Sequence, residues 1–157
     1  MDLKSHAVTM SLTGESKGVN FPGLGPEMER RVWYITVTPN LLLSLHPDYV
    51  MTHLHTPLSP EQTYIECSWL FAPEAFELDG FDPAYAVDFW DITNREDWAA
   101  CEAVMRGMRN LGYRPGPLSS WEGTVYQFLT WTANLYLGNG FVIPEVPIRN
   151  LRTISSS

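Results

Sequence analysis

Asp97 lies in line with an apolar stripe of a predicted helix, which is an unusual place for a charge. Steps of four, three and four residues from Asp97 reach Cys101, Val104 and Met108, and residues at this spacing share one face of an α-helix. We therefore expect Asp97 to face the core. A buried carboxylate stays ionised only when a cation or hydrogen-bond donors offset the loss of water. The spacing makes Asp97 a candidate metal ligand, with an ordinary first-turn acid that interacts with the helix dipole or an arginine as the alternative.

The helix that carries Asp97 has a clear predicted start. Asp82 is a good N-cap, and Pro83 fits the first helical position. Thr93 and Glu96 fit a capping box, which predicts a bend between two helical pieces over residues 89–94. Gly112 and the prolines that follow it should end this helix.

A second helix is expected further along the chain. Ser119 and Glu122 form another capping box, and apolar residues recur at helical spacing until a break near Gly138. Residues 141–157 contain prolines and three terminal serines with little periodicity, which predicts an irregular tail. The domain prediction is therefore one unit over residues 1–140 followed by this tail.

The first half of the chain is strand-like. Segments rich in β-branched, aromatic and leucine residues are separated by short turns, which indicates antiparallel pairing. In the last segment Ile65, Cys67, Trp69 and Phe71 share one face and are expected to face the core. The five predicted strands are residues 7–12, 31–38, 40–46, 49–55 and 63–71.

Strands followed by long helices predict an α+β fold, in which a curved antiparallel sheet packs one face against the C-terminal helices. This layout is helix-grip or START-like, and a sheet curved around a long helix leaves a cavity. The sequence has no glycine-rich phosphate loop and no nucleophile elbow. Nucleotide-dependent and serine-hydrolase chemistry are therefore not expected.

Composition narrows the class of protein. The 157 residues, 45% hydrophobic and 13% aromatic, can bury one sizeable core. A net charge of −8 argues against nucleic acid or an acidic membrane as a partner, because both require clustered Lys and Arg. We found neither a membrane-spanning run nor a signal peptide and expect a cytoplasmic protein. Cys67 and Cys101 are expected to be buried thiols.

Several motifs occur in an order and at spacings that carry a family resemblance. The motifs are the run Pro-Asn-Leu-Leu-Leu-Ser-Leu-His-Pro-Asp-Tyr at residues 39–49, Phe89-Trp90-Asp91, Asn94-Arg95-Glu96-Asp97-Trp98, Cys101-Glu102, Gly107 and residues 119–122. With these motifs, the sequence resembles the catalytic domain of the alpha subunit of Rieske non-haem iron oxygenases, the aromatic ring-hydroxylating dioxygenases, over residues 9–137.

The resemblance implies a mononuclear Fe(II) held by two histidines and one aspartate, with open positions for dioxygen and substrate. Asp97 matches the aspartate of the family, and Asp91 and Asn94 are the alternatives in the preceding turns. Side chains that could line the site or support the ligand are Asn94, Trp98, Cys101, Glu102 and Met105.

The sequence departs from the family in its histidines and cysteines. The family carries its histidine ligands as His-x4-His, and no such spacing exists here. We expect His53 and His55 to lie on opposite faces of one strand, one in the core and one in solvent, and we assign neither a role. Two isolated cysteines cannot bind a 2Fe-2S cluster. We therefore expect the chain to be a C-terminal fragment whose iron histidines and cluster lie in a missing N-terminal region.

For the intact protein, the resemblance implies hydroxylation or demethylation of an aromatic or methylated-ammonium substrate with dioxygen. A ferredoxin or reductase would supply electrons, and a homotrimer is the implied assembly. The alternative is a non-catalytic START-like module that binds a small apolar ligand, because the same layout serves both purposes.

Overall fold

The computed structural model describes residues 1–140 and divides the chain into two compact units, residues 1–111 and the residues from 112 onward. Each unit is described by itself. The predicted irregular tail, residues 141–157, lies outside the described residues. None of the described helices is both long enough and apolar enough to cross a membrane.

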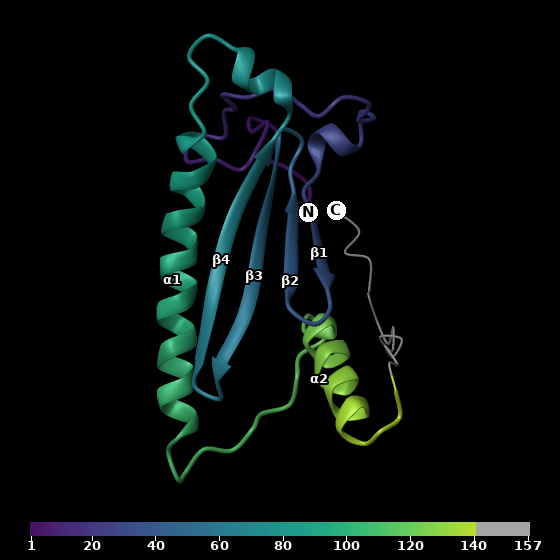
Figure 1. The fold of residues 1–157 in the computed structure, drawn as a ribbon, viewed down its shortest axis with the longest axis vertical. Coiled ribbons are helices and arrows are strands. Elements are labelled where there is room, and N and C mark those ends of the chain that lie inside the picture. The colour runs from purple at the N-terminus through teal and green to yellow at the C-terminus, as the bar shows by residue number, and fades with distance from the viewer. Residues whose placement is uncertain (141–157) are drawn as a thin grey trace, which may run out of the picture. The chain divides into compact units, whose positions relative to one another are not determined.

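The first unit is built on a four-stranded antiparallel sheet in which each strand pairs with the next along the chain (Figure 1). Short turns between the strands permit this order. The strands are β1 (Trp33–Val37), β2 (Leu41–Leu45), β3 (Tyr49–Ser59) and β4 (Gln62–Phe71). Four of the five predicted strands are thereby confirmed in position.

Residues 7–12, predicted as a strand, do not form one, and this prediction is wrong. The backbone N–H groups of Val8 and Thr9 both donate to the Gly14 carbonyl oxygen, at 2.8 and 3.4 Å. Gly14 has a φ of +79°, which a residue with a side chain rarely adopts. The segment therefore folds back on itself in a local turn.

Helix α1 (Ala84–Met108) runs alongside β4 and packs against the sheet (Figure 1). It begins one residue later than predicted, with Pro83 as the N-cap residue. The Asp82 carboxylate accepts a hydrogen bond from the Ala84 N–H at 2.9 Å. The predicted bend is wrong, because α1 is continuous and the Thr93 hydroxyl donates back to the Phe89 carbonyl instead of capping a new helix. Two short 3₁₀-helices, Met28–Arg30 and Pro73–Glu77, complete this unit.

The core of the first unit lies between α1 and one face of the sheet. Tyr49 and Met51 of β3 are fully buried against Ala86 and Trp90 of α1. The Trp90 indole N–H donates to the Tyr49 hydroxyl at 2.9 Å. The predicted core face of β4 is confirmed where Cys67, Trp69 and Phe71 pack against this cluster.

The second unit contains α2 (Gly123–Tyr136). The predicted start is confirmed in part, because the Glu122 carboxylate accepts a hydrogen bond from the Ser119 N–H at 2.6 Å. The N-cap residue is Glu122 and not Ser119, and the Glu122 side chain makes no cap hydrogen bond to the helix. The helix ends just before Gly138, whose φ of +73° suits a residue without a side chain.

Together the two units give an α+β protein. The described residues hold one open sheet and two α-helices.

Candidate functional site

The face of α1 that meets the sheet is not the one that the Asp97 stripe predicts. The buried residues of α1 are Ala86, Trp90 and Asn94, which follow one another every four residues. Asp97, by contrast, is exposed. The expectation that Asp97 faces the core is therefore wrong.

The rest of the predicted stripe is exposed as well. Cys101, Val104 and Met108 all face away from the core. The inward row instead continues through the half-buried Trp98 and Met105. Trp90, Trp98 and Met105 recur at helical spacing, and this spacing is a signal in the sequence that could have located this face.

Asn94 is the polar side chain that α1 turns toward the sheet, with 4% of its surface exposed. Its amide oxygen lies 3.0 Å from Nε2 of His53 on β3, and its amide nitrogen donates to the Cys67 thiol sulfur of β4 at 3.7 Å. One amide thus links β3 and the edge strand β4 to the helix.

His53 and His55 lie on the same face of β3, so the expectation of opposite faces is wrong. Residues two apart on a strand point the same way. Both side chains are half-buried, and their rings stack with centroids 6.1 Å apart and planes inclined by 24°. The structure therefore brings two imidazoles together beside Asn94.

The pKa of His53 is lowered from its ordinary value of 6.5, chiefly because burial disfavours the charged ring. The hydrogen bond to Asn94 acts in the opposite direction, and so does the negative charge of Asp97. The negative charge of Asp97 is therefore near enough to stabilise the protonated His53 ring, although the Asp97 side chain is exposed to solvent.

The other candidate side chains differ in their surroundings. Cys101, expected to be a buried thiol, is exposed, and both cysteines are free. Glu102 is also exposed and faces Arg106 one turn later, at 3.9 Å. Asp91, the alternative ligand, pairs with Arg95 at 2.7 Å. Of the predicted set, Asn94 is buried and hydrogen-bonded to the sheet, Trp98 and Met105 are half-buried, and Cys101 and Glu102 are exposed.

A complete metal site is not found in the part of the chain that the structure describes. Among residues 1–140, no group of three His, Cys, Asp or Glu side chains could hold a metal ion. The donor set of a two-histidine, one-aspartate iron centre is therefore not fitted by these residues alone.

Asp48 is a buried acid that the sequence reasoning missed. It is fully buried, and its carboxylate accepts hydrogen bonds from the hydroxyls of Thr9, Ser16 and Tyr85, at 2.5, 2.5 and 2.7 Å. These bonds attach the N-terminal segment and the start of α1 to the turn between β2 and β3. The role of Asp48 is thus to hold segments together. The motif at residues 39–49 contains Asp48, but nothing in that motif predicts its burial or its three partners.

His46 is buried beside this turn with 4% of its surface exposed, and neither ring nitrogen has a hydrogen-bond partner. Its ring stacks on Tyr49 with centroids 4.0 Å apart and meets the edge of Trp90. Burial lowers its pKa from 6.5 to about 3, so the ring is neutral at pH 7.

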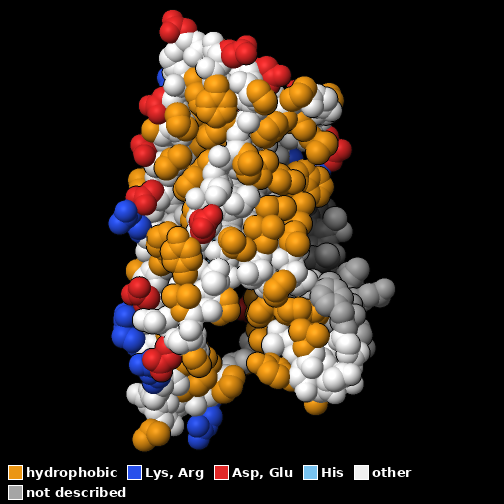
Figure 2. Space-filling view, viewed as in Figure 1, with side chains coloured by type: hydrophobic (Ala, Val, Ile, Leu, Met, Phe, Trp, Pro, Cys, Tyr) orange, Lys and Arg blue, Asp and Glu red, His pale blue; other side chains and the backbone are white. Residues whose placement is uncertain are grey.

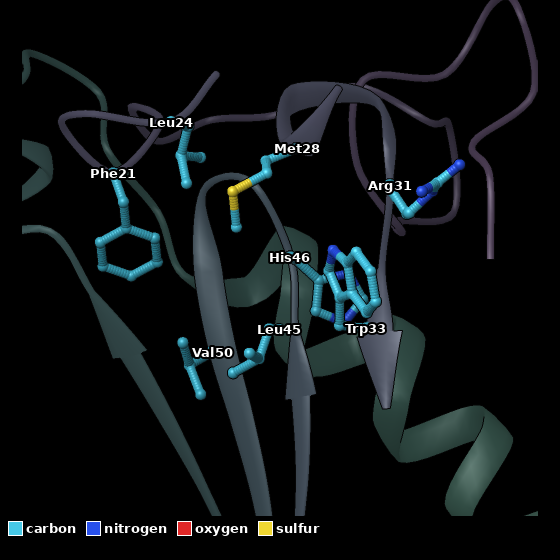
Figure 3. Close-up of a pocket in the computed structure, with 8 residues that line it drawn as sticks. All are labelled: Phe21, Leu24, Met28, Arg31, Trp33, Leu45, His46 and Val50. Atoms are coloured by element: carbon cyan, nitrogen blue, oxygen red, sulfur yellow. The ribbon is translucent and has the colours of Figure 1, made fainter. Parts of the chain in front are cut away.

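A pocket of about 170 Å³ opens near the same end of the sheet. Figure 3 shows Leu24 and Met28 reaching from the preceding segment toward Leu45 and Val50, with the Arg31 side chain directed away. Arg31 is also engaged elsewhere, with Asp2 at 2.8 Å and Glu27 at 2.6 Å. The lining is therefore mainly apolar; its residues are Phe21, Leu24, Met28, Arg31, Trp33, Leu45, His46 and Val50.

Comparisons with known proteins bear on the whole of the described chain. Residues 1–138 match the model of the ring hydroxylating alpha subunit catalytic domain. The oxygenase subunit of a glycine betaine monooxygenase from Chromohalobacter salexigens is 28% identical over 131 residues, which cover 83% of this chain and 29% of the relative. That of Pseudomonas aeruginosa is 27% identical over 140 residues, covering 88% of this chain and 33% of the relative.

This chain thus spans about a third of the length of the curated relatives it matches. The family match, by contrast, takes in the sheet, α1 and α2. It confirms the family that the ordered motifs predicted, and the chain belongs to the ring hydroxylating alpha subunit family, as part of its catalytic domain.

Proposed function

We propose that this chain forms part of the catalytic domain of an iron-dependent, Rieske-type oxygenase that acts on a methylated-ammonium or aromatic substrate. The observation that carries the proposal is the family match over residues 1–138. The two glycine betaine monooxygenase relatives favour the methylated-ammonium class.

The metal site of this oxygenase is proposed to be shared between this chain and polypeptide beyond it. Asp97 would supply one carboxylate, and its exposure leaves it free to meet groups from outside residues 1–140. The histidine ligands and the 2Fe-2S cluster would come from that other polypeptide, because residues 1–140 do not contain a complete ligand set. Iron would supply oxygen activation there.

The residues of this chain would mainly shape the wall of the active site and exclude water from it. The half-buried Trp98 lies next to Asp97, and an aromatic face attracts a quaternary ammonium group when water is excluded. Asn94 would hold β3 and β4 against α1 behind it. The sheet and α1 are proposed to belong to a larger helix-grip domain, in a cytoplasmic homotrimer that receives electrons from a ferredoxin or reductase.

The experiment that tests this proposal is reconstitution with glycine betaine. The chain is co-expressed with the remaining part of a glycine betaine monooxygenase oxygenase subunit, which would supply the missing ligands, and is given reductase, NADH and dioxygen and assayed for formaldehyde. Hydroxylation of an N-methyl group consumes dioxygen and two electrons, and the carbinolamine product releases formaldehyde. We expect formaldehyde only when this chain is present, and loss of it with Asp97→Ala.

Asp88→Ala is the matched control, because Asp88 is an exposed acid on the same helix. This variant should keep the wild-type rate. Equal formaldehyde production by Asp97→Ala and the wild type would refute the proposed ligand role, and activity without this chain would refute its part in the enzyme.

A second candidate function is favoured by the apolar pocket between the N-terminal segment and the sheet. A volume of about 170 Å³ is close to that of an apolar cavity able to hold benzene. The chain would then bind a small apolar ligand without chemistry. Calorimetry with benzene tests this binding separately from catalysis. Met28→Trp should abolish benzene binding, whereas formaldehyde release by the reconstituted oxygenase should stay unchanged.

A further inference from the structure

We infer that His53 and His55 form a two-imidazole binding site for a divalent transition-metal cation such as Zn²⁺, Ni²⁺ or Cu²⁺. This site differs from the His-x4-His arrangement of the family and goes beyond the proposed oxygenase function. It depends only on residues of the first unit.

The two rings are close enough to share a cation. An imidazole nitrogen lies about 2.1 Å from such a metal and about 1.1 Å from its ring centre, so two ligand rings have centroids at most about 6.4 Å apart. The observed separation is 6.1 Å. A tetrahedral angle at the metal corresponds to about 5 Å, and both lone pairs, which lie in the ring planes, must point at the metal. Because the two planes are inclined by only 24°, the half-buried His55 side chain has to rotate when the cation binds.

Asn94 prepares His53 for this role. An amide oxygen can only accept, so Nε2 of His53 carries the proton in the 3.0 Å hydrogen bond to Asn94. The lone pair is then on Nδ1. Histidines that bind metals usually donate their other ring N–H to a carbonyl or carboxylate oxygen, which fixes the ring and its tautomer. Asn94 provides that oxygen from a buried position.

Charge also favours a cation here. Burial lowers the pKa of His53, which disfavours the protonated ring that could not coordinate a metal. The carboxylate of Asp97 is near enough to stabilise positive charge at His53.

The expected affinity is modest and selective. Within residues 1–140 no third His, Cys, Asp or Glu completes a cluster with the pair, so water would fill the remaining positions. Nitrogen sites generally prefer Cu²⁺, Ni²⁺ and Zn²⁺ to Fe²⁺. The pair should consequently take up these ions while retaining little iron.

The test is titration of the purified 157-residue chain with NiCl₂ or ZnCl₂ by calorimetry, together with NMR of the histidine ring nitrogens. We expect one ion per chain and a shift of the His53 Nδ1 signal. His55→Gln should weaken binding at least about tenfold, and Asn94→Ala should weaken it by about 10–100-fold while leaving both histidines in place.

His6→Gln is the matched control, because His6 is an exposed histidine outside the pair. It should bind as the wild type does. Unchanged affinity in His55→Gln, or an equal loss in His6→Gln, would overturn the site. Circular dichroism of each variant separates loss of the ligand from loss of the fold. Formaldehyde release in the reconstituted oxygenase tests the proposed function independently of this result.

Discussion

At the scale of single residues, the helix–sheet interface depends on an amide. Asn94 connects His53 and Cys67, whereas Asp97, three residues later, faces solvent. A step of three residues turns a helix by about 300°, so the two side chains leave the helix in directions about 60° apart. That angle is enough to separate a buried position from an exposed one.

The motif around Asp97 could be recognised from the sequence, but its orientation could not. The hydrophobicity of Cys101, Val104 and Met108 predicts a stripe that faces the core, but these side chains are exposed in this structure. The pairing of Asn94 with His53 joins residues 41 positions apart. A contact between residues so far apart in the sequence cannot be predicted from the spacing of neighbouring residues.

Asn94 and Asp97 should differ sharply in their effect on stability. Asn94→Ala removes the buried amide that hydrogen-bonds the half-buried His53 and Cys67 and should lower the free energy of unfolding by about 1–3 kcal/mol. Asp97→Asn changes an exposed side chain and should stay within about 0.5 kcal/mol of the wild type. Urea unfolding followed by circular dichroism measures both, and a larger loss in Asp97→Asn would contradict the observed orientation.

His46 should make the stability of the chain depend on pH. Its pKa is about 3 in the folded protein and 6.5 ordinarily, so the unfolded chain binds the proton more readily. Stability is fully present above pH 6.5 and is lost as the pH falls toward 3. The loss should approach about 1 kcal/mol for each pH unit.

The variant His46→Phe isolates this contribution, because it keeps a ring against Tyr49 but cannot titrate. Urea unfolding at pH 4.5 and pH 7 should show a smaller pH effect in His46→Phe than in the wild type. His6→Gln should keep the wild-type pH effect. Equal pH effects in His46→Phe and the wild type would show that His46 takes up no proton on unfolding.

At the scale of elements, four strands and both helices could be predicted because their patterns are local. Alternation along β4 and the Asp82–Pro83 helix start each depend on neighbouring residues only. The predicted strand at residues 7–12 failed because Gly14 allowed a competing turn, and the predicted bend failed because the Thr93 hydroxyl bonded within the helix. Local signals were ambiguous at both places.

The packing of α1 on β3 should depend on Trp90. Trp90→Ala removes a buried ring and its hydrogen bond to Tyr49, and should cost about 3–5 kcal/mol of unfolding free energy. Ile92→Ala on the exposed side of the same helix should cost about 0.5 kcal/mol. Thermal unfolding of the two variants compares them, and similar losses would contradict the observed face of α1.

At the scale of the whole molecule, the first unit leaves an apolar sheet face open. Tyr49 and Met51 face α1, so their neighbours along β3 and the residues paired with those neighbours face the other way. Trp33, Ile35 and Leu54 on that second face are more than a third exposed. Figure 2 shows hydrophobic side chains gathered over the strands, with acidic and basic side chains along α1.

An open apolar face of this kind should make the isolated chain self-associate, since monomeric proteins rarely expose large apolar patches. Ile35→Lys should reduce the association. Val104→Lys adds the same charge on α1 and should leave it unchanged. Light scattering after size-exclusion chromatography at two concentrations measures this, and a monomer at both would contradict the prediction.

Iron content of the purified 157-residue chain tests the central claim most directly. Among residues 1–140, which hold no group of three metal ligands, we propose one iron ligand, Asp97, and an imidazole pair that favours other metals over Fe²⁺. After anaerobic incubation with Fe(II) and desalting, inductively coupled plasma mass spectrometry should find far less than one iron per chain. Tight binding of one iron per chain, abolished by Asp97→Ala, would show that this chain completes the iron site alone and would contradict the account.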